Sequence, residues 1–114
     1  MSGIFRAEEQ PRRITCGLLR KIIGKGDCDC VDFAEVEVTG ETKRHYHNDA
    51  TEFYYVLEGK LEVDLEGQKG VCGPGDLVMI TPGTKHRARA MGEKARLLVA
   101  CCQPWEAADE IIAE

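Results

Sequence analysis

Apolar and polar residues alternate along several short segments of this chain. Between Ala34 and Val38, apolar residues occupy every second position and glutamates occupy the positions between them. The same alternation runs from Leu61 to Glu66, where acidic residues separate the aliphatic ones. Because side chains at i and i+2 of a strand lie on one face of the sheet, both segments are predicted to be strands with one buried face and one face in water.

Glycine and proline residues indicate tight turns between such segments. The turns are predicted at Gly24–Gly26, Gly40, Glu58-Gly59, Glu66-Gly67, Gly73–Asp76, Pro82-Gly83 and Gly92. The predicted strands are Ile14–Ile23, Val31–Val38, Lys43–His47, Glu52–Leu57, Lys60–Leu65, Leu77–Ile80, His86–Ala90 and Ala95–Cys102. Short strands at even spacing, with no long helical period between them, predict an all-β fold, either an antiparallel sandwich or a barrel.

The C-terminal part of the chain has a different pattern. Pro104 is typical of the first turn of a helix, and we predict one short helix from Pro104 to Ile112. The preceding segment, Leu97–Cys102, is apolar at every position, so both of its faces should be covered. One face is expected in the barrel and the other against the helix or a second subunit. Since Phe53 and Tyr55 are also predicted to point outward, we expect a homodimer.

Chain length and composition are those of one globular domain. The 114 residues, 43% hydrophobic and 31% charged, are enough for a single core, expected to span residues 1–114 with its barrel at about 31–102. The net charge of −5 argues against a nucleic-acid or anionic-membrane partner. The N-terminus lacks the apolar stretch of a secretory signal, and Leu97–Cys102 is too short to cross a bilayer. We therefore expect a cytoplasmic protein without a nucleic-acid or membrane partner.

The cysteines have no recognisable metal or disulfide spacing. They are Cys16, Cys28, Cys30, Cys72, Cys101 and Cys102. This arrangement resembles neither paired zinc knuckles nor a small secreted disulfide framework. We expect most of them to be reduced thiols packed as small apolar residues in the core. The alternative is a second metal site or a redox pair at Cys28 and Cys30.

All three histidines of the chain belong to one pattern. His45 and His47 lie two residues apart in a predicted strand, so their imidazoles share a face. Glu52 follows five residues after His47, and Pro82-Gly83 precedes His86. Imidazole and carboxylate ligands together suit a divalent transition metal. Each residue alone would fit a solvated surface side chain, but the combination favours a metal site.

The order of these residues resembles the two motifs of the cupin superfamily. The first motif is represented by Gly40, His45, His47, Glu52 and Gly59, and the second by Gly75-Asp76, Pro82-Gly83 and His86. The resemblance runs from about Glu37 to Ala100. The stretch from His45 to Gly59 particularly resembles small single-domain cupins that are called mannose-6-phosphate isomerase-like.

This resemblance implies a fold and a cofactor. The fold would be a double-stranded β-helix, which is a jelly-roll barrel. One divalent transition metal, such as Zn, Fe, Mn or Ni, would be bound by His45, His47, Glu52 and His86. The chain departs from the family pattern at Thr81, where proline is usual, at Ala90, where asparagine is usual, and in having four residues rather than five between Gly40 and His45. None of these differences removes a ligand.

Strand parity selects further candidates for the pocket. Tyr54 shares parity with Glu52 and could donate a hydrogen bond to a substrate or act as a general acid or base. Lys43 shares parity with His45 and could place a positive group at the mouth of the pocket, whereas Arg87 and Arg89 do not share parity with His86. The alternatives are an ordinary barrel tyrosine and a lysine lying along the surface.

Three functions are compatible with such a site. The first is a metal-dependent isomerase of a sugar or sugar phosphate, with an open coordination position for a small oxygen-rich ligand. The second is an iron-dependent dioxygenase. The third is a non-enzymatic module that binds a small molecule through the metal. The ligand set does not choose among them, because fold and ligands alone do not specify a reaction.

Overall fold

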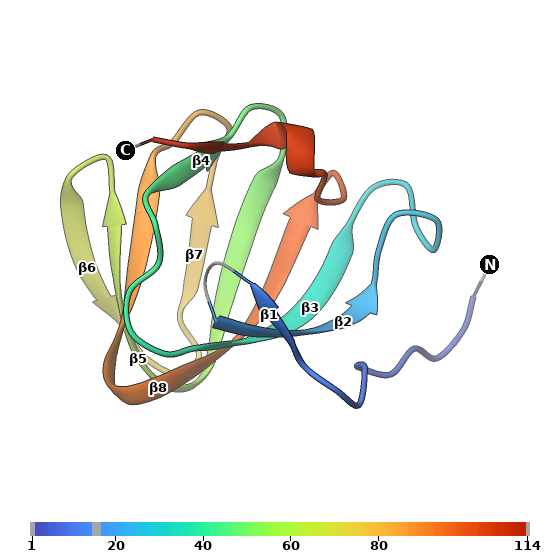
Figure 1. The fold of residues 1–114 in the computed structure, drawn as a ribbon, viewed down its shortest axis with the longest axis horizontal. Coiled ribbons are helices and arrows are strands. Elements are labelled where there is room, and N and C mark those ends of the chain that lie inside the picture. Colours follow the sequence, from blue (N-terminus) through green and yellow to red (C-terminus); the bar gives the residue numbers. More distant parts are fainter. Residues whose placement is uncertain (1, 15–16, 114) are drawn as a thin grey trace.

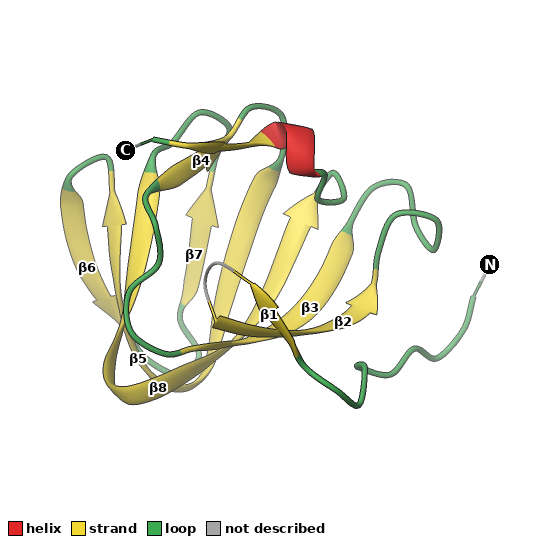
Figure 2. Ribbon diagram, in the orientation of Figure 1, coloured by secondary structure: helices red, strands yellow, loops and turns green. Residues whose placement is uncertain are grey.

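The computed structural model describes residues 2–14 and 17–113 of the chain. Its strands are β1 Arg12–Ile14, β2 Gly17–Ile23, β3 Asp32–Val38, β4 His45–His47, β5 Thr51–Leu65, β6 Gln68–Cys72, β7 Leu77–Ile80, β8 His86–Cys102 and β9 Glu110–Ile112. Among these described residues the only helical element is one 3-10 turn, Ala107–Asp109 (Figures 1 and 2). Within the same residues, no helix has the length and hydropathy needed to span a bilayer. The predicted all-β fold is confirmed.

Two long strands, β5 and β8, organise the sheet. They pair with each other along most of their length, and β8 also pairs with β3 and β4 while β5 also pairs with β6 and β7. All of these pairings are antiparallel. Because each long strand takes part in both sides of the curled sheet (Figure 1), the strands enclose a core between them. This arrangement is the predicted jelly-roll barrel.

Both long strands continue through positions where the sequence predicts a turn. The turns predicted at Glu58-Gly59 and at Gly92 are wrong, since both positions lie inside continuous strands. The β5–β8 register shifts between Val56 and Lys60, and Gly59 has a φ of 77°. A Cβ at Gly59 would lie 2.5 Å from the Lys94 carbonyl oxygen. Glycine at this bulge therefore lets β5 bend from one side of the barrel to the other without ending.

The predicted helix from Pro104 to Ile112 is also wrong. After the 3-10 turn the chain forms β9, which pairs antiparallel with β4 and places Glu110 opposite His47 and Ile112 opposite His45. The β4 strand would otherwise present unpaired backbone groups at a sheet edge. The β-branched residues of β9 suit this pairing better than a helix. In Figure 1 the C-terminal segment runs directly along β4.

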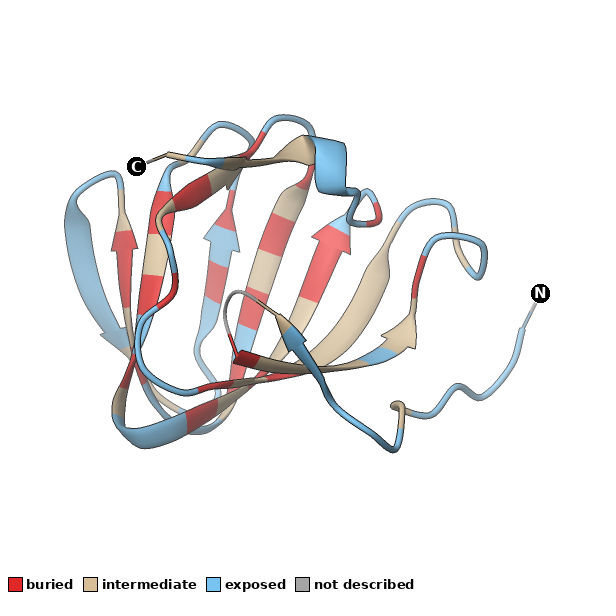
Figure 3. Cartoon of the chain, viewed as in Figure 1, coloured by how far each residue is buried: buried red, intermediate tan, exposed pale blue. Residues whose placement is uncertain are grey.

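The core lies inside the barrel and follows the predicted alternation in β3, β5 and β8. Along much of β5 and β8, buried positions alternate with less buried ones in Figure 3, whereas in β3 the alternation is limited to its end, where Val36 and Val38 are buried. The segment Leu97–Cys102 pairs with β3 along one edge and with β5 along the other. Its residues from Leu97 to Cys101 are buried or half-buried, whereas Cys102 is exposed. The buried apolar cluster consists of Val36, Val38, Tyr54, Val56, Leu61, Val63, Val78, Ile80, Ala88, Ala90, Ala95 and Leu97.

The described cysteines are free thiols, but most of them are not core residues. Among the described cysteines only Cys101 is buried. The others are partly or fully exposed: Cys28, Cys30, Cys72 and Cys102. The expectation of core thiols is wrong for Cys28, Cys30 and Cys102, because they lie in the β2–β3 loop or at the end of β8, where one side faces solvent. Cys72 is partly buried and packs against the core. Cys16 lies outside the described residues.

Candidate metal centre

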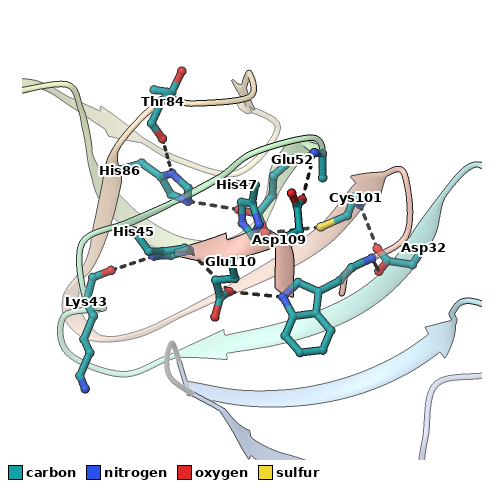
Figure 4. A network of polar contacts seen from close by, with 12 residues as sticks. Asp32, Lys43, His45, His47, Glu52, Thr84, His86, Cys101, Asp109 and Glu110 are labelled. Carbon is teal, nitrogen blue, oxygen red and sulfur yellow. Dashed lines mark hydrogen bonds and ion pairs between the residues drawn. The ribbon is translucent and has the colours of Figure 1, made fainter. Parts of the chain in front are cut away.

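Four side chains from three strands converge on one point (Figure 4). His45 and His47 extend from the same face of β4, Glu52 lies near the start of β5, and His86 begins β8. His45 and His86 are direct partners in the antiparallel β4–β8 pairing. One ligand atom from each of the four residues lies within 4.8 Å of the others. The structure thus brings together the residues that the sequence predicts as a ligand set.

Backbone carbonyl groups orient two of the imidazole rings. His45 Nδ1 lies 2.9 Å from the Lys43 carbonyl oxygen, and His86 Nδ1 lies 2.9 Å from the Thr84 carbonyl oxygen. A carbonyl oxygen only accepts hydrogen bonds, so Nδ1 of each ring must be the donor. In the neutral ring the free lone pair is then on Nε2. This tautomer can bind a metal through Nε2.

Several buried polar atoms of the cluster make no hydrogen bond of good geometry. They are both ring nitrogens of His47, Nε2 of His86 and Oε1 of Glu52. Glu52 Oε1 lies 3.4 Å from His47 Nε2 and 3.2 Å from His86 Nε2. Buried polar atoms normally have a partner, and a single cation would supply one to His47 Nε2, His86 Nε2 and Glu52 Oε1 together. The residues present therefore fit a divalent metal, and three imidazoles with one carboxylate suit a transition metal.

The electrostatics of the cluster keep its carboxylate ionised. Burial raises the pKa of Glu52, but the side chains of His47 and His86 outweigh this effect and lower it to about 2. Burial lowers the pKa of His45. Burial also acts to lower the pKa of His47, yet the neighbouring Glu52 carboxylate raises it overall. The site thus holds an anionic ligand in a setting that a cation would neutralise.

A buried thiol supports the carboxylate from the side opposite the histidines. Cys101 Sγ donates a hydrogen bond to Glu52 Oε2 at 3.6 Å, and the Cys101 backbone N–H donates to Asp32 Oδ1 at 2.9 Å. Burial raises the pKa of the Cys101 thiol, so it remains protonated and acts as a donor. Sequence reasoning missed this role because an apolar strand offers no sign of which thiol faces a carboxylate.

The C-terminal strap, defined here as Ala107–Ile112, brings two further carboxylates to the site. Glu110 Oε1 lies 3.9 Å from His45 Nε2 and accepts a hydrogen bond from Trp105 Nε1 at 3.3 Å. Asp109 fixes the strap by accepting hydrogen bonds from the backbone N–H groups of Asp49 at 2.7 Å and Ala50 at 3.1 Å. Sequence reasoning missed both residues because it placed this segment in a helix.

Tyr54, the first tentative pocket residue, lies inside the barrel close to the histidines. Its side chain is buried, and its ring centroid is 6.3 Å from that of His86, in an edge-on arrangement. This position is compatible with the proposed hydrogen bond to a bound substrate. A core residue without a catalytic role would occupy the same position. The catalytic role of Tyr54 therefore stays a prediction.

Lys43, the second tentative pocket residue, contacts the cluster through its main chain. Its carbonyl group orients His45, whereas its side chain points away from the four ligands in Figure 4. It lines a surface pocket of about 440 Å³ that none of the four ligands lines. The other lining residues are Glu41, Thr42, Arg87 and Ile112. A role for the Lys43 ammonium group in ligand binding stays a prediction.

Comparison with known proteins gives matches across this region. The cupin domain family matches residues 32–101, a range that includes all four residues of the cluster. An uncharacterised protein of Methanocaldococcus jannaschii is 33% identical over 87 residues, which cover 76% of this chain and 70% of that protein. Quercetin 2,3-dioxygenase of Bacillus subtilis is 39% identical over 54 residues, which cover 47% of this chain but only 16% of the dioxygenase.

Solved structures show the same fold at lower sequence identity. A protein from Planctomyces limnophilus matches with a TM-score of 0.87 and 23% identity, covering 98% of this chain and 97% of that one. Oxalate decarboxylase from Bacillus subtilis matches with a TM-score of 0.80 and 17% identity, covering 98% of this chain and 32% of the decarboxylase. The chain therefore corresponds to about a third of that larger enzyme.

Proposed function

This chain belongs to the cupin family, and we propose on that premise that it is a metal-dependent protein that acts on a small oxygen-rich molecule, with isomerisation of a sugar or sugar phosphate as its reaction. His45, His47, Glu52 and His86 would hold one divalent metal. When bound, the metal would polarise a carbonyl or hydroxyl oxygen of the ligand. The observation that carries the proposal is the convergence of four ligand atoms, three of which are buried without a well-formed hydrogen bond.

The size of the ligand set supports binding of a further molecule. Four protein ligands leave one or two positions open in a five- or six-coordinate shell. A small carboxylate, diol or sugar derivative offers the oxygen atoms that such positions accept. The resemblance to oxalate decarboxylase, whose name specifies a small dicarboxylic acid, is consistent with a ligand of this class.

An isomerase also needs a group that moves a proton between neighbouring carbons. Glu110 offers a carboxylate outside the ligand set, 3.9 Å from His45 Nε2 and only partly exposed. Tyr54 offers a phenol whose ring centroid lies 6.3 Å from that of His86. We assign the proton transfer to Glu110, because a carboxylate is a common general base and this one lies beside the ligand set without belonging to it.

The second candidate is dioxygenation. It is favoured by one specific observation, the 39% identity with quercetin 2,3-dioxygenase over 54 residues. In this case the metal would be iron, and molecular oxygen would be consumed. The third candidate is a non-enzymatic module that binds a small molecule through the metal. It would use the same four metal ligands but would not turn the molecule over.

The test begins with protein purified without a chelating tag, whose metal is identified by elemental analysis. Thermal shift of metal-loaded and metal-free protein is then measured with sugar phosphates, small dicarboxylic acids and diols. We expect stabilisation of the metal-loaded form only. For a stabilising sugar, proton NMR in heavy water should show solvent deuterium entering the carbon next to the carbonyl, as proton transfer requires.

The variant Glu110→Gln separates the proposals. We expect it to retain the metal and the ligand-induced thermal shift while losing deuterium incorporation. Oxygen consumption with an iron-loaded protein would favour the dioxygenase instead. Ligands that stabilise metal-loaded and metal-free protein equally would contradict every metal-dependent function.

A further inference from the structure

A pair of thiols lies in the loop between β2 and β3, apart from the metal ligands. Cys28 Sγ and Cys30 Sγ are 3.5 Å apart. Cys28 is partly buried and Cys30 is exposed, so a small molecule in solution can reach the pair. Neither residue belongs to the metal-ligand cluster. The pair thus forms a separate group of nucleophiles.

Hydrogen bonds within the loop hold the two thiols near each other. The Gly24 N–H donates to Asp27 Oδ2 at 3.0 Å, and the Asp27 N–H donates back to the Gly24 carbonyl oxygen at 3.0 Å. The Cys28 N–H donates to the same carbonyl oxygen at 3.3 Å. A turn fixed in this way reduces the conformational entropy that would be lost when the thiols react together.

The two thiols differ in their surroundings. The backbone N–H groups of Cys30 and Val31 and the Cys30 thiol all donate toward Cys28 Sγ, which lowers the Cys28 pKa against the opposing effects of burial and of Asp29. The contact with Cys28 raises the pKa of Cys30. Since the thiolate is the reactive form, Cys28 is the better nucleophile and Cys30 is suited to the second step.

We propose that Cys28 and Cys30 form a dithiol site that is modified reversibly by thiol–disulfide exchange with a small disulfide of the glutathione class. The Cys28 thiolate attacks one sulfur of that disulfide, forms a mixed disulfide and releases one thiolate. Cys30 then loses its proton to solvent, attacks Cys28 Sγ and expels the second thiolate. The two cysteines are oxidised to one disulfide, and the small disulfide is reduced to two thiols.

A third thiol close to the loop provides a matched control. Cys102 Sγ donates to the Cys30 carbonyl oxygen at 3.1 Å, and its side chain is exposed like that of Cys30. Its bond is to the main chain and not to either sulfur. Cys102 therefore tests whether exposure alone decides reactivity or whether the Cys28–Cys30 arrangement does.

The experiment treats the full chain with oxidised glutathione, blocks the remaining thiols with N-ethylmaleimide and maps every cysteine by peptide mass spectrometry. In the unaltered protein we expect the peptide with Cys28 and Cys30 to carry an internal disulfide and no alkyl group. Cys30→Ser should trap one glutathione on Cys28, and Cys28→Ser should react at Cys30 about tenfold more slowly. Cys102→Ser should form the disulfide at the unaltered rate, and dithiothreitol should reverse the modification.

Three results would overturn the proposal. The first is equal reaction rates of Cys28→Ser and Cys30→Ser. The second is modification of Cys102 or Cys72 as rapid as that of Cys28. The third is a Cys28–Cys30 peptide that stays fully alkylated after oxidation. Circular dichroism of each variant checks that these surface substitutions leave the fold unchanged.

Discussion

His45 and His86 face each other directly across the antiparallel pairing of β4 with β8. In each of them Nδ1 lies 2.9 Å from the backbone carbonyl oxygen two residues earlier in the chain. The same local geometry is thus repeated on two neighbouring strands, and it presents Nε2 of both rings to one point. The geometry of this candidate metal site therefore follows from the fold, because the sheet register positions the two rings and the main chain sets their tautomer.

Metal affinity is predicted to fall as the pH falls from about 7.5 to 5, because imidazole must be neutral to coordinate. The raised pKa of His47 means that this ring holds its proton to a higher pH than an ordinary histidine, so its proton must leave when the metal binds. Glu52 stays ionised through this range, because its pKa is lowered to about 2. The loss is therefore assigned to the histidines.

Isothermal titration of zinc in two buffers with different ionisation enthalpies measures the proton release. We expect release of at least part of a proton per metal near pH 6.5, the ordinary pKa of histidine. A zinc affinity that is constant over this range of pH, with no buffer dependence, would exclude the histidines as ligands.

Removing the Asp109 carboxylate is predicted to loosen the C-terminal strap. Asp109→Ala loses hydrogen bonds to the backbone N–H groups of Asp49 and Ala50. The free energy of unfolding should drop by about 1–3 kcal/mol, and the Asp49 and Ala50 amides should exchange faster with solvent. Urea denaturation and hydrogen exchange measure the two effects. The control is Glu93→Ala, at an exposed position of β8. Equal unfolding free energies and equal amide exchange rates in the two variants would disprove the anchoring role of Asp109.

Two glycine substitutions separate backbone strain from steric conflict. Gly59 and Gly92 both have positive φ, at 77° and 86°. An added Cβ would lie 2.5 Å from the Lys94 carbonyl oxygen at Gly59, whereas nothing lies within 4 Å at Gly92. Backbone strain costs about 1–2 kcal/mol in both alanine variants. Because only Gly59→Ala adds the steric conflict, it should lower the free energy of unfolding more than Gly92→Ala in urea denaturation. Equal losses of unfolding free energy in the two variants would show that the backbone at the Gly59 bulge shifts enough to remove the steric conflict.

A homodimer is predicted to form through the outer face of β5 and β7. Phe53 pairs with Met79 and Tyr55 pairs with Leu77, and Tyr55, Leu77 and Met79 are 40%, 60% and 58% exposed. Neighbouring exposed apolar residues of this kind are typical of a subunit interface. Sedimentation of the unaltered chain should give a dimer, and Met79→Glu should give a monomer. Val71→Glu, at an exposed position of β6, should remain dimeric, and a monomeric unaltered chain at high micromolar concentration contradicts the prediction.

The barrel and the ligand cluster could be predicted because the sequence patterns that indicate them involve residues close together in the chain. Alternation in β3 marks the buried face, and the spacing of His45 and His47 fixes two imidazoles on one side of a strand. The bulge at Gly59 could not be recognised in this way. A glycine after a charged residue looks like a turn, and only the pairing with β8 keeps β5 continuous.

The surroundings of the site depend on contacts between distant segments. The placement of Glu110 follows from the need of β4 for a second strand neighbour, which the C-terminal sequence alone does not reveal. The contact of Cys101 with Glu52 likewise depends on the β5–β8 register, in which these two residues are partners. Sequence patterns therefore predict the ligands more readily than the groups that support them.

One divalent metal is predicted to bind to His45, His47, Glu52 and His86. The most direct test is elemental analysis of protein that has been stripped with a chelator, reloaded with metal and desalted. We predict one metal per chain for the unaltered protein and for the control Glu93→Gln, and close to none for the double variant His45→Ala, His47→Ala with its β-sheet circular dichroism retained. Full metal occupancy in that folded double variant would contradict the account.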